Sequence, residues 1–257
     1  MLEVNGLCKS FGDARRRKEV LRDLSFQVGD GEFVSIIGPS GSGKTTLFGA
    51  IGGLEPPSAG EVKIGGAVTT GQTGHVAYMP QQASLLPWRT VAGNIELSLA
   101  IAGVDKRKAK EDAAMWLERV GLGEYAGAYP HVLSGGMQQR VSFLRALLSP
   151  QRLMLLDEPF GALDALTRGQ MQKWLLSIWE QNRRAVLLVT HSIEEALYLS
   201  DRILVLSSAP AELVDEITVP FERPRREELW RDARFMELKE RVYRHLGEAR
   251  GADGHGG

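Results

Sequence analysis

The stretch Gly38-Pro39-Ser40-Gly41-Ser42-Gly43-Lys44-Thr45 decides the fold of this chain of 257 residues. It follows the apolar run Phe33-Val34-Ser35-Ile36-Ile37 and precedes a segment whose apolar residues have helical spacing. A strand, a glycine-rich loop and a helix in this order are typical of a loop whose backbone N–H groups surround phosphate oxygens. A glycine-rich loop can also simply turn a strand into a helix, but the spacing favours the phosphate site. The stretch therefore predicts that the chain binds a nucleoside triphosphate.

The residues of this loop have separate expected tasks. Lys44 offsets phosphate charge, Thr45 supplies a hydroxyl ligand for Mg²⁺, and the helix that begins near Lys44 directs its positive dipole end at the anion. The remaining members of the predicted nucleotide site are Gly38, Ser40, Gly41, Gly43 and Thr46. The predicted cofactors are ATP and Mg²⁺.

The chain on either side alternates between strand-like and helical patterns. Short β-like segments lie between residues 2 and 64, and we expect the helix after Thr45 to include Leu54 and to stop near Pro56-Pro57. A helical pattern runs from 85 to 149, and residues 152–157 and 185–190 are apolar runs without alternation, as expected for central strands covered on both faces. The pattern predicts an α/β protein with a helical insertion.

Asp157 and Glu158 stand at the end of the apolar run 152–157, where doubly wound sheets present ligand-binding groups. We expect Asp157 to face Mg²⁺ through water, and Glu158 to face the γ-phosphate and polarise the attacking water. General-base assistance of this kind is typically worth about 10²- to 10⁴-fold in rate. By itself an Asp-Glu pair could equally be a strand-end cap.

Ser134-Gly135-Gly136 precedes a second amphipathic helix, which carries Val141, Leu144, Leu147 and Leu148. A hydroxyl and two glycines at a helix N-terminus suit an anion, although the same residues often serve only as a helix cap. Two such helix starts in one chain raise the question of which phosphate each one binds.

Together these residues resemble one family, the ATP-binding cassette (ABC) ATPases, and among them the subunits of bacterial importers of the nitrate, sulfonate and taurine type. The resemblance covers about residues 2 to 207. It implies a P-loop NTPase with a RecA-like α/β core (1–84 and 150–207), an antiparallel β subdomain and an inserted helical subdomain (85–149). Residues 208–257 form a C-terminal extension, for which we expect one amphipathic helix and a disordered tail from Gly251 to Gly257.

The resemblance also implies roles for single residues. Leu133-Ser134-Gly135-Gly136-Met137 is similar to the family signature, which contacts the γ-phosphate of ATP held by the opposite subunit, so a homodimer with ATP at its interface is expected. Gln81 resembles the glutamine that approaches Mg²⁺ and the attacking water. Asp164 resembles the acid of the loop at the dimer seam, His191 the histidine that hydrogen-bonds the γ-phosphate, and Phe11 the aromatic ring that stacks on adenine.

Two positions depart from the family pattern. Met137 ends the signature where Gln is commonest, and because Ser134 and the glycines carry the phosphate contacts, we expect little loss. Gly161 replaces a frequent Ser in the loop before Asp164, which weakens detailed expectations about communication across the dimer.

Composition limits the partners. With 31 Lys and Arg against 32 Asp and Glu, the formal net charge is −1, which does not favour nucleic acid. A single cysteine, Cys8, excludes a disulfide within the chain, and no apolar run is long enough to span a membrane. We expect a peripheral protein at the cytoplasmic face of the bacterial cell membrane, bound to integral-membrane permease subunits. A solute-binding protein is expected as an indirect partner, through the permease.

Leu85-Leu86-Pro87-Trp88 follows Gln81 closely, and in the resembling importers this region forms a groove for a permease helix. Leu86 and Trp88 could line that groove, or Trp88 could belong to the core.

Two other functions compete with the importer ATPase. A soluble ABC-type ATPase of translation or DNA repair usually carries two cassettes or a long coiled-coil insertion. A small-molecule kinase needs neither Ser134-Gly135-Gly136 nor His191.

Overall fold

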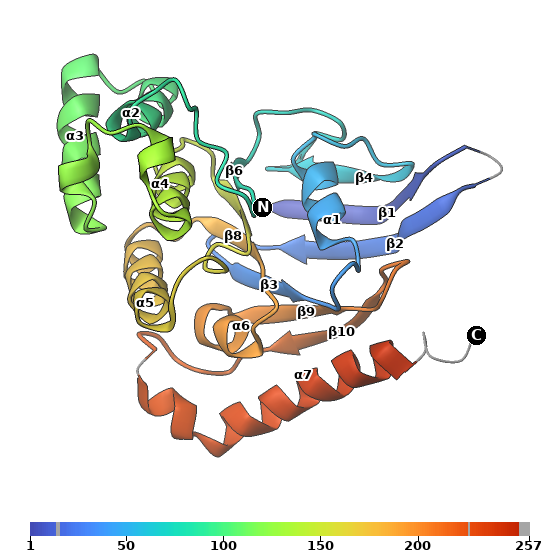
Figure 1. Cartoon of the computed structure of the whole chain (residues 1–257). Coiled ribbons are helices and arrows are strands. Elements are labelled where there is room, and N and C mark those ends of the chain that lie inside the picture. The colour runs from blue at the N-terminus through green and yellow to red at the C-terminus, as the bar shows by residue number, and fades with distance from the viewer. Residues whose placement is uncertain (14–15, 226, 252–257) are drawn as a thin grey trace.

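The computed structural model describes residues 1–13, 16–225 and 227–251. Two sheets form its centre (Figure 1). The larger has six strands in the order β10 (Leu213–Thr218), β9 (Arg202–Leu206), β3 (Phe33–Ile37), β8 (Ala185–Val189), β7 (Leu153–Asp157) and β6 (Ala77–Met79). All neighbours in it are parallel except β10, which pairs antiparallel with β9. The expected α/β fold is confirmed.

The second sheet is antiparallel and contains β2 (Lys18–Val28), β1 (Leu2–Phe11), β4 (Ala59–Ile64) and β5 (Ala67–Val68). Its apolar side chains share one buried cluster with α1 (Lys44–Ile51) and with one face of the parallel sheet. Strand β5 is short and lies inside the glycine-rich stretch 65–74.

The three central parallel strands β3, β7 and β8 are buried at every position. Strands covered on both faces have no solvent side, so their sequences do not alternate between apolar and polar residues. On the face away from the antiparallel sheet, one apolar cluster combines these strands with four helices, namely α2 (Val91–Ile101), α3 (Lys106–Arg119), α4 (Gly135–Leu147) and α5 (Ala165–Asn182). Helices α2, α3 and α4 gather at one end of the molecule (Figure 1).

Helix α1 ends earlier than the sequence suggested. It stops at Ile51, and Leu54 is 59% exposed beyond it, so the expectation that Leu54 belongs to the apolar face of this helix is wrong. Gly52 and Gly53 follow Ile51, and Gly53 has a positive φ of 73°, which ends the helix before Pro56.

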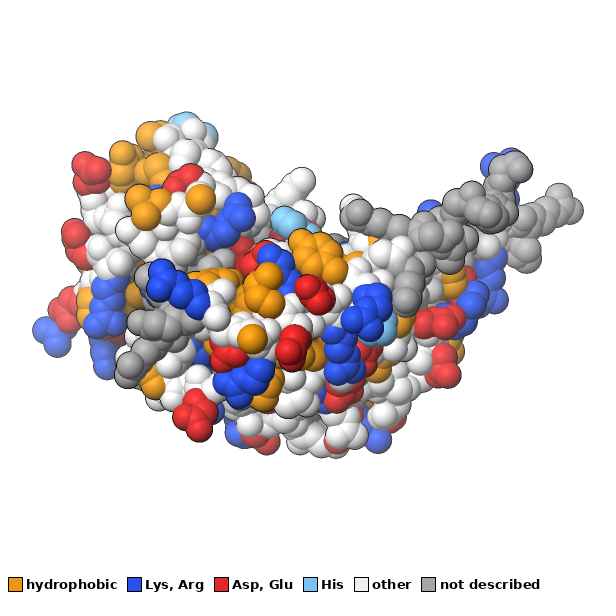
Figure 2. All heavy atoms as spheres, turned by 90° about the horizontal axis from the view of Figure 1, so that it is seen from below, with side chains coloured by type: hydrophobic (Ala, Val, Ile, Leu, Met, Phe, Trp, Pro, Cys, Tyr) orange, Lys and Arg blue, Asp and Glu red, His pale blue; other side chains and the backbone are white. Residues whose placement is uncertain are grey.

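The C-terminal residues are part of the fold. Helix α7 (Ala233–Gly251) packs against α6 (Ile193–Leu199) and β9, and it buries Phe235 and Val242 almost completely. Leu229 lies in a separate short 3₁₀ helix (Glu227–Arg231) rather than in α7. On the face seen in Figure 2, acidic, basic and apolar side chains intermingle. The predicted tail lies outside the described residues, except for Gly251, which ends α7.

Candidate nucleotide-binding site

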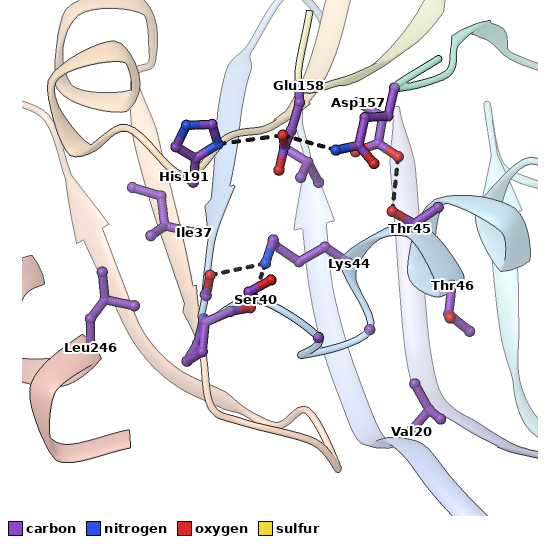
Figure 3. A pocket seen from close by; sticks show the side chains of 16 residues that line it. Val20, Ile37, Ser40, Lys44, Thr45, Thr46, Asp157, Glu158, His191 and Leu246 are labelled. Atoms are coloured by element: carbon purple, nitrogen blue, oxygen red, sulfur yellow. Dashed lines mark hydrogen bonds and ion pairs between the residues drawn. The ribbon is translucent and has the colours of Figure 1, made fainter. Parts of the chain in front are cut away.

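A cavity of about 600 Å³ lies where the phosphate loop meets the carboxyl ends of β3, β7 and β8. The site residues expected from the sequence that line it are Gly38, Ser40, Gly41, Gly43, Lys44, Thr45, Thr46, Gln81, Asp157, Glu158 and His191. Figure 3 shows most of their side chains directed into this cavity. Residues from four separate parts of the sequence thus meet at one place.

The loop between β3 and α1 has backbone conformations that only glycine adopts readily. Gly41 and Gly43 have φ values of 77° and 95°. A Cβ atom on Gly43 would lie 2.7 Å from Cγ1 of Val20, so strand β2 leaves no room for a side chain there. Gly43 is also the N-cap of α1 and has no side chain to bond the first N–H groups of the helix, which leaves them available to an anion.

Lys44 lies at the centre of this loop and is only 8% exposed. Its Nζ donates to the carbonyl oxygens of Gly38 at 2.9 Å and Pro39 at 2.7 Å, and to Oγ of Ser42 at 3.2 Å. Burial lowers the pKa of Lys44, while the carboxylates of Glu158 and Asp157 act in the opposite direction. A desolvated ammonium group in this position strongly favours a multiply charged anion.

Thr45 and Asp157 meet across the cavity. Oγ1 of Thr45 donates to Oδ2 of Asp157 at 3.0 Å, and Asp157 is 1% exposed at the end of β7. Burial raises the pKa of Asp157, and the hydrogen bond from Thr45 partly offsets that effect. A hydroxyl and a carboxylate are hard oxygen donors of the kind Mg²⁺ prefers, so the two side chains fit such an ion.

Glu158, Gln81 and His191 form a polar cluster next to this pair, and Figure 3 shows Glu158 and His191 joined in it. Oε2 of Glu158 accepts a hydrogen bond from Nε2 of Gln81 at 3.1 Å and lies 3.4 Å from Nδ1 of His191. The three residues come from the loops after β7, β6 and β8, whose carboxyl ends lie side by side in the parallel sheet. The cluster can therefore hold and orient a water molecule beside a terminal phosphate.

The residues on either side of His191 are held by a hydrogen-bond network that no sequence motif pointed to at first. Oγ1 of Thr190 donates to Oε2 of Glu195 at 2.5 Å, and Nε2 of Gln172 donates to Oε1 of the same carboxylate at 3.0 Å. Oγ of Ser192 caps α6 by accepting from the N–H of Glu195. Ser192 and Glu195 have capping-box spacing, a signal that could have located this helix start from the sequence.

Five predicted residues lie outside the cavity. Ser134 and Asp164 serve as helix caps: Oγ of Ser134 accepts from the N–H of Met137 at 3.3 Å, and Oδ1 of Asp164 accepts from the N–H of Thr167 at 3.0 Å. Gly135 and Gly136 open α4 beside Ser134. Phe11 is 42% exposed at the end of β1, with Nζ of Lys9 located 4.8 Å from the centre of its ring.

Apolar residues that were not predicted there also line the cavity, among them Val20 and Leu246. Val20 comes from β2 and Leu246 from α7. Leu246 could not be predicted at the cavity, because nothing in a single sequence shows that the last helix passes the phosphate loop. Val20 closely follows the charged run from Arg15 to Lys18, which is typical of a solvated loop and gives no sign of a nucleotide contact.

Comparisons with known proteins agree with this geometry. Residues 21–161 match the model of the ABC transporter family. The taurine import ATP-binding protein TauB of Yersinia pestis bv. Antiqua is 43% identical over 221 residues, covering 86% of this chain and 85% of that protein. The formylaminopyrimidine import ATP-binding protein ThiZ of Halalkalibacterium halodurans is 48% identical over 201 residues, covering 78% of each chain.

A solved dimeric cassette in a post-hydrolysis state, bound to ADP and Pi, superposes with a TM-score of 0.78 at 30% identity and covers 86% of this chain and 100% of its own. The fold, the cluster of residues around the phosphate loop and these similarities lead to the same assignment. The chain belongs to the ABC transporter family, and it is an ATPase of that family.

Proposed function

We propose that this protein hydrolyses ATP to energise an importer of a small solute, of the nitrate, sulfonate or taurine class. The observation that carries the proposal is the joint placement of the phosphate loop, Asp157, Glu158, Gln81 and His191 around one cavity, in a chain 43% identical to TauB. Relatives named for taurine and formylaminopyrimidine import support the importer rather than a soluble ATPase of translation or repair.

In the proposed reaction, backbone N–H groups of the loop and Nζ of Lys44 bind the phosphates of ATP. Thr45 and Asp157 would hold Mg²⁺, with Gln81 close to it, and the ion would supply charge neutralisation at the transferred phosphoryl group. Glu158 accepts the proton of the attacking water, while Gln81 and His191 hold its carboxylate in place. Phosphoryl transfer needs positioning and charge stabilisation above all, and these residues provide both.

The dimer explains the predicted residues that lie outside the cavity. Ser134, Gly135 and Gly136 stand at the N-terminus of α4, away from their own phosphate loop. In a head-to-tail dimer each α4 N-terminus meets the ATP bound by the other subunit, and Asp164 lies at the seam. Phe11 stays a prediction for the adenine contact, to which we add Val20 as a lining residue. Two ATP molecules at the interface stabilise the closed dimer, so their hydrolysis lets the dimer open again, and this movement is what drives transport.

The exposure of Trp88 supports the proposal that the protein binds a membrane-embedded partner. Trp88 is 72% exposed, so the alternative expectation of a core role for it is wrong, and it lies in the segment between Gln81 and α2. Helix α2 begins at Val91 with Thr90 as its N-cap. Within the described residues no helix is long and apolar enough to cross a bilayer. We propose that Trp88 and Leu86 help to bind integral-membrane permease subunits, which a solute-binding protein serves.

The test is recovery of the Glu158→Gln protein from membranes in the presence of Mg-ATP, followed by identification of the chains that co-purify. A multi-span permease together with an ATP-dependent dimer is the expected result. Ribosomal or DNA-repair partners instead of a permease would refute the importer. A Trp88→Ala protein provides the matched surface variant: it should hydrolyse ATP alone but recover less permease.

A further inference from the structure

A buried amide joins α4 to the loop that follows β7. Gln139 is 3% exposed, and its Nε2 donates to the main-chain oxygen of Glu158 at 3.0 Å. Its Oε1 accepts from the main-chain N–H of Ala162 at 3.0 Å. Both polar ends of one side chain are thus bonded to backbone groups of the same loop. The amide ties the start of that loop to the residue four positions later.

The backbone at Glu158 needs such support. Its φ is 48°, in the left-handed region that is unfavourable for residues other than glycine. Three hydrogen bonds hold this conformation. The N–H of Glu158 donates to the oxygen of Val189 at 2.9 Å, and the oxygen of Glu158 accepts from the N–H of Gly161 at 3.1 Å and from Gln139. Only the bond from Gln139 comes from a side chain, so a substitution can remove it.

The φ angle of Glu158 sets the direction of its side chain, because it fixes where the Cα–Cβ bond points. In the observed conformation the carboxylate reaches both Nε2 of Gln81 and Nδ1 of His191. An ordinary right-handed or extended backbone at this position would turn the carboxylate away from both. We propose that Gln139 is a positioning residue that keeps Glu158 in its left-handed conformation and so aims the carboxylate at the attacking water. This inference rests on the role proposed above for Glu158.

The contact also links two parts of the ATPase within one chain. Gln139 lies three residues after Gly136, where a Cβ atom would lie 3.1 Å from Cδ2 of Leu163 and 3.3 Å from the oxygen of Ala162. The first turns of α4 are therefore packed against the same loop that Gln139 bonds. A displacement of the α4 N-terminus, which we expect to contact the ATP of the other subunit, moves Glu158 with it.

The test uses two variants, Gln139→Leu and Gln139→Met. Both remove the two hydrogen bonds of the amide while filling the space, and Met keeps an unbranched side chain like that of Gln. Gln138→Leu is the matched control. Nε2 of Gln138, on the same helix, donates to the carbonyl oxygens of Pro130 at 3.0 Å and Leu133 at 3.2 Å. Neither bond involves Glu158 or the loop that follows it. For each variant the ATP affinity, KM, kcat and thermal unfolding midpoint are measured.

We expect Gln139→Leu to lower kcat about tenfold or more with little change in ATP affinity, since only the barrier to the chemical step rises. Gln138→Leu should shift the unfolding midpoint comparably but change kcat much less. Equal effects of the two variants on kcat would mean that loss of helix packing explains the result, and would overturn the proposal. So would wild-type kcat in both folded Gln139 variants.

Combining Gln139→Leu with Glu158→Gln separates this inference from the role of Glu158. If Gln139 acts through the Glu158 carboxylate, the double variant should hydrolyse ATP in single-turnover assays no more slowly than Glu158→Gln alone. A further drop of the full size seen in the single variant would overturn the proposal. Wild-type hydrolysis by Glu158→Gln would instead refute the role of Glu158 itself.

Discussion

Oγ1 of Thr45 donates a hydrogen bond of 3.0 Å to Oδ2 of Asp157, which lies 112 positions later in the chain. The bond joins the first turn of α1 to the end of β7, so two of the three residues expected at the metal are fixed relative to each other by the main elements of the fold. Their geometry is a property of the sheet and helix, and it does not depend on a loop.

Replacing Thr45 with Val should reduce Mg²⁺-dependent hydrolysis about tenfold to a hundredfold, because the shape is kept while the hydroxyl ligand is lost. Thr45→Ser keeps the hydroxyl and should retain most of the activity. The measurement is a Mg²⁺ titration of the ATPase rate, together with nucleotide binding in EDTA. An unchanged Mg²⁺ dependence in Thr45→Val would exclude this residue as a ligand.

Replacing Lys44 with Met should weaken ATP binding about tenfold or more, since a buried ammonium group is removed from the phosphate loop. The loop carbonyls of Gly38 and Pro39 also lose their donor, so the loop itself should become less ordered. Lys63→Met is a suitable control, because Nζ of Lys63 pairs with Glu61 at 2.9 Å on the antiparallel sheet. Equilibrium binding of a fluorescent ATP analogue distinguishes the two variants.

A mixture of two inactive variants should regain activity if each site combines two subunits. Lys44→Met disables one subunit's phosphate loop. Ser134→Asp keeps a good N-cap for α4 but places a negative charge next to the partner's ATP. Half of the dimers in an equal mixture contain both variants and have one intact site out of two, so about a quarter of wild-type activity is expected.

The control for this experiment is each variant measured alone at the same total concentration. Activity in the mixture no higher than the sum of the two would mean that Ser134 serves the ATP of its own subunit. Co-purification of untagged Lys44→Met chains with tagged Ser134→Asp chains in Mg-ATP verifies that mixed dimers form.

The attachment of α7 should depend on pH through Asp215. Oδ1 of Asp215 lies 2.7 Å from Nη2 of Arg241, and its Oδ2 lies 2.9 Å from Nε2 of His245. Burial acts to raise the pKa of Asp215, but the hydrogen bond from Arg241 and the other favourable contacts prevail, and the pKa lies below its ordinary value of 3.8. The carboxylate thus stabilises the fold above about pH 3.8, and this contribution is lost as the pH falls through the lowered value.

Asp215→Asn should therefore have a lower unfolding midpoint than the wild type at pH 7, and the difference should shrink below the ordinary carboxyl pKa. Thermal unfolding of both proteins across pH 3 to 8 measures this, on the order of a few degrees at most. A difference that stays constant down to pH 3 would show that the charge of Asp215 does not anchor α7.

Local patterns were enough to predict the central strands and the phosphate loop. The run 153–157 has no alternation because both faces of β7 are covered, and the order of strand, glycines and Lys44 leaves few other folds. Asp157 and Glu158 were predicted because they stand at the end of an apolar strand, whereas Gln81 and His191 were predicted from the resemblance to the ABC ATPases. Their convergence then followed from the parallel topology.

Other features depend on contacts between distant residues. Strand β10 pairs with β9 at the edge of the parallel sheet, and α7 crosses to the phosphate loop, where Leu246 lines the cavity. No periodicity within residues 208–257 indicates either contact. Gln139 was overlooked for the same reason: it looks like one more polar residue of an amphipathic helix, and only the structure shows that both ends of its amide are bonded to the loop after Glu158.

The close approach of Val20 to Gly43 shows that both sheets shape the cavity. The antiparallel sheet limits the shape of the phosphate loop through β2, while the parallel sheet carries Asp157 and Glu158. A substitution at Val20 can therefore change the space around the phosphate loop without replacing either carboxylate at the end of β7. The loop that receives the phosphates and the acids that face them are thus supported from opposite sides, each by a different sheet.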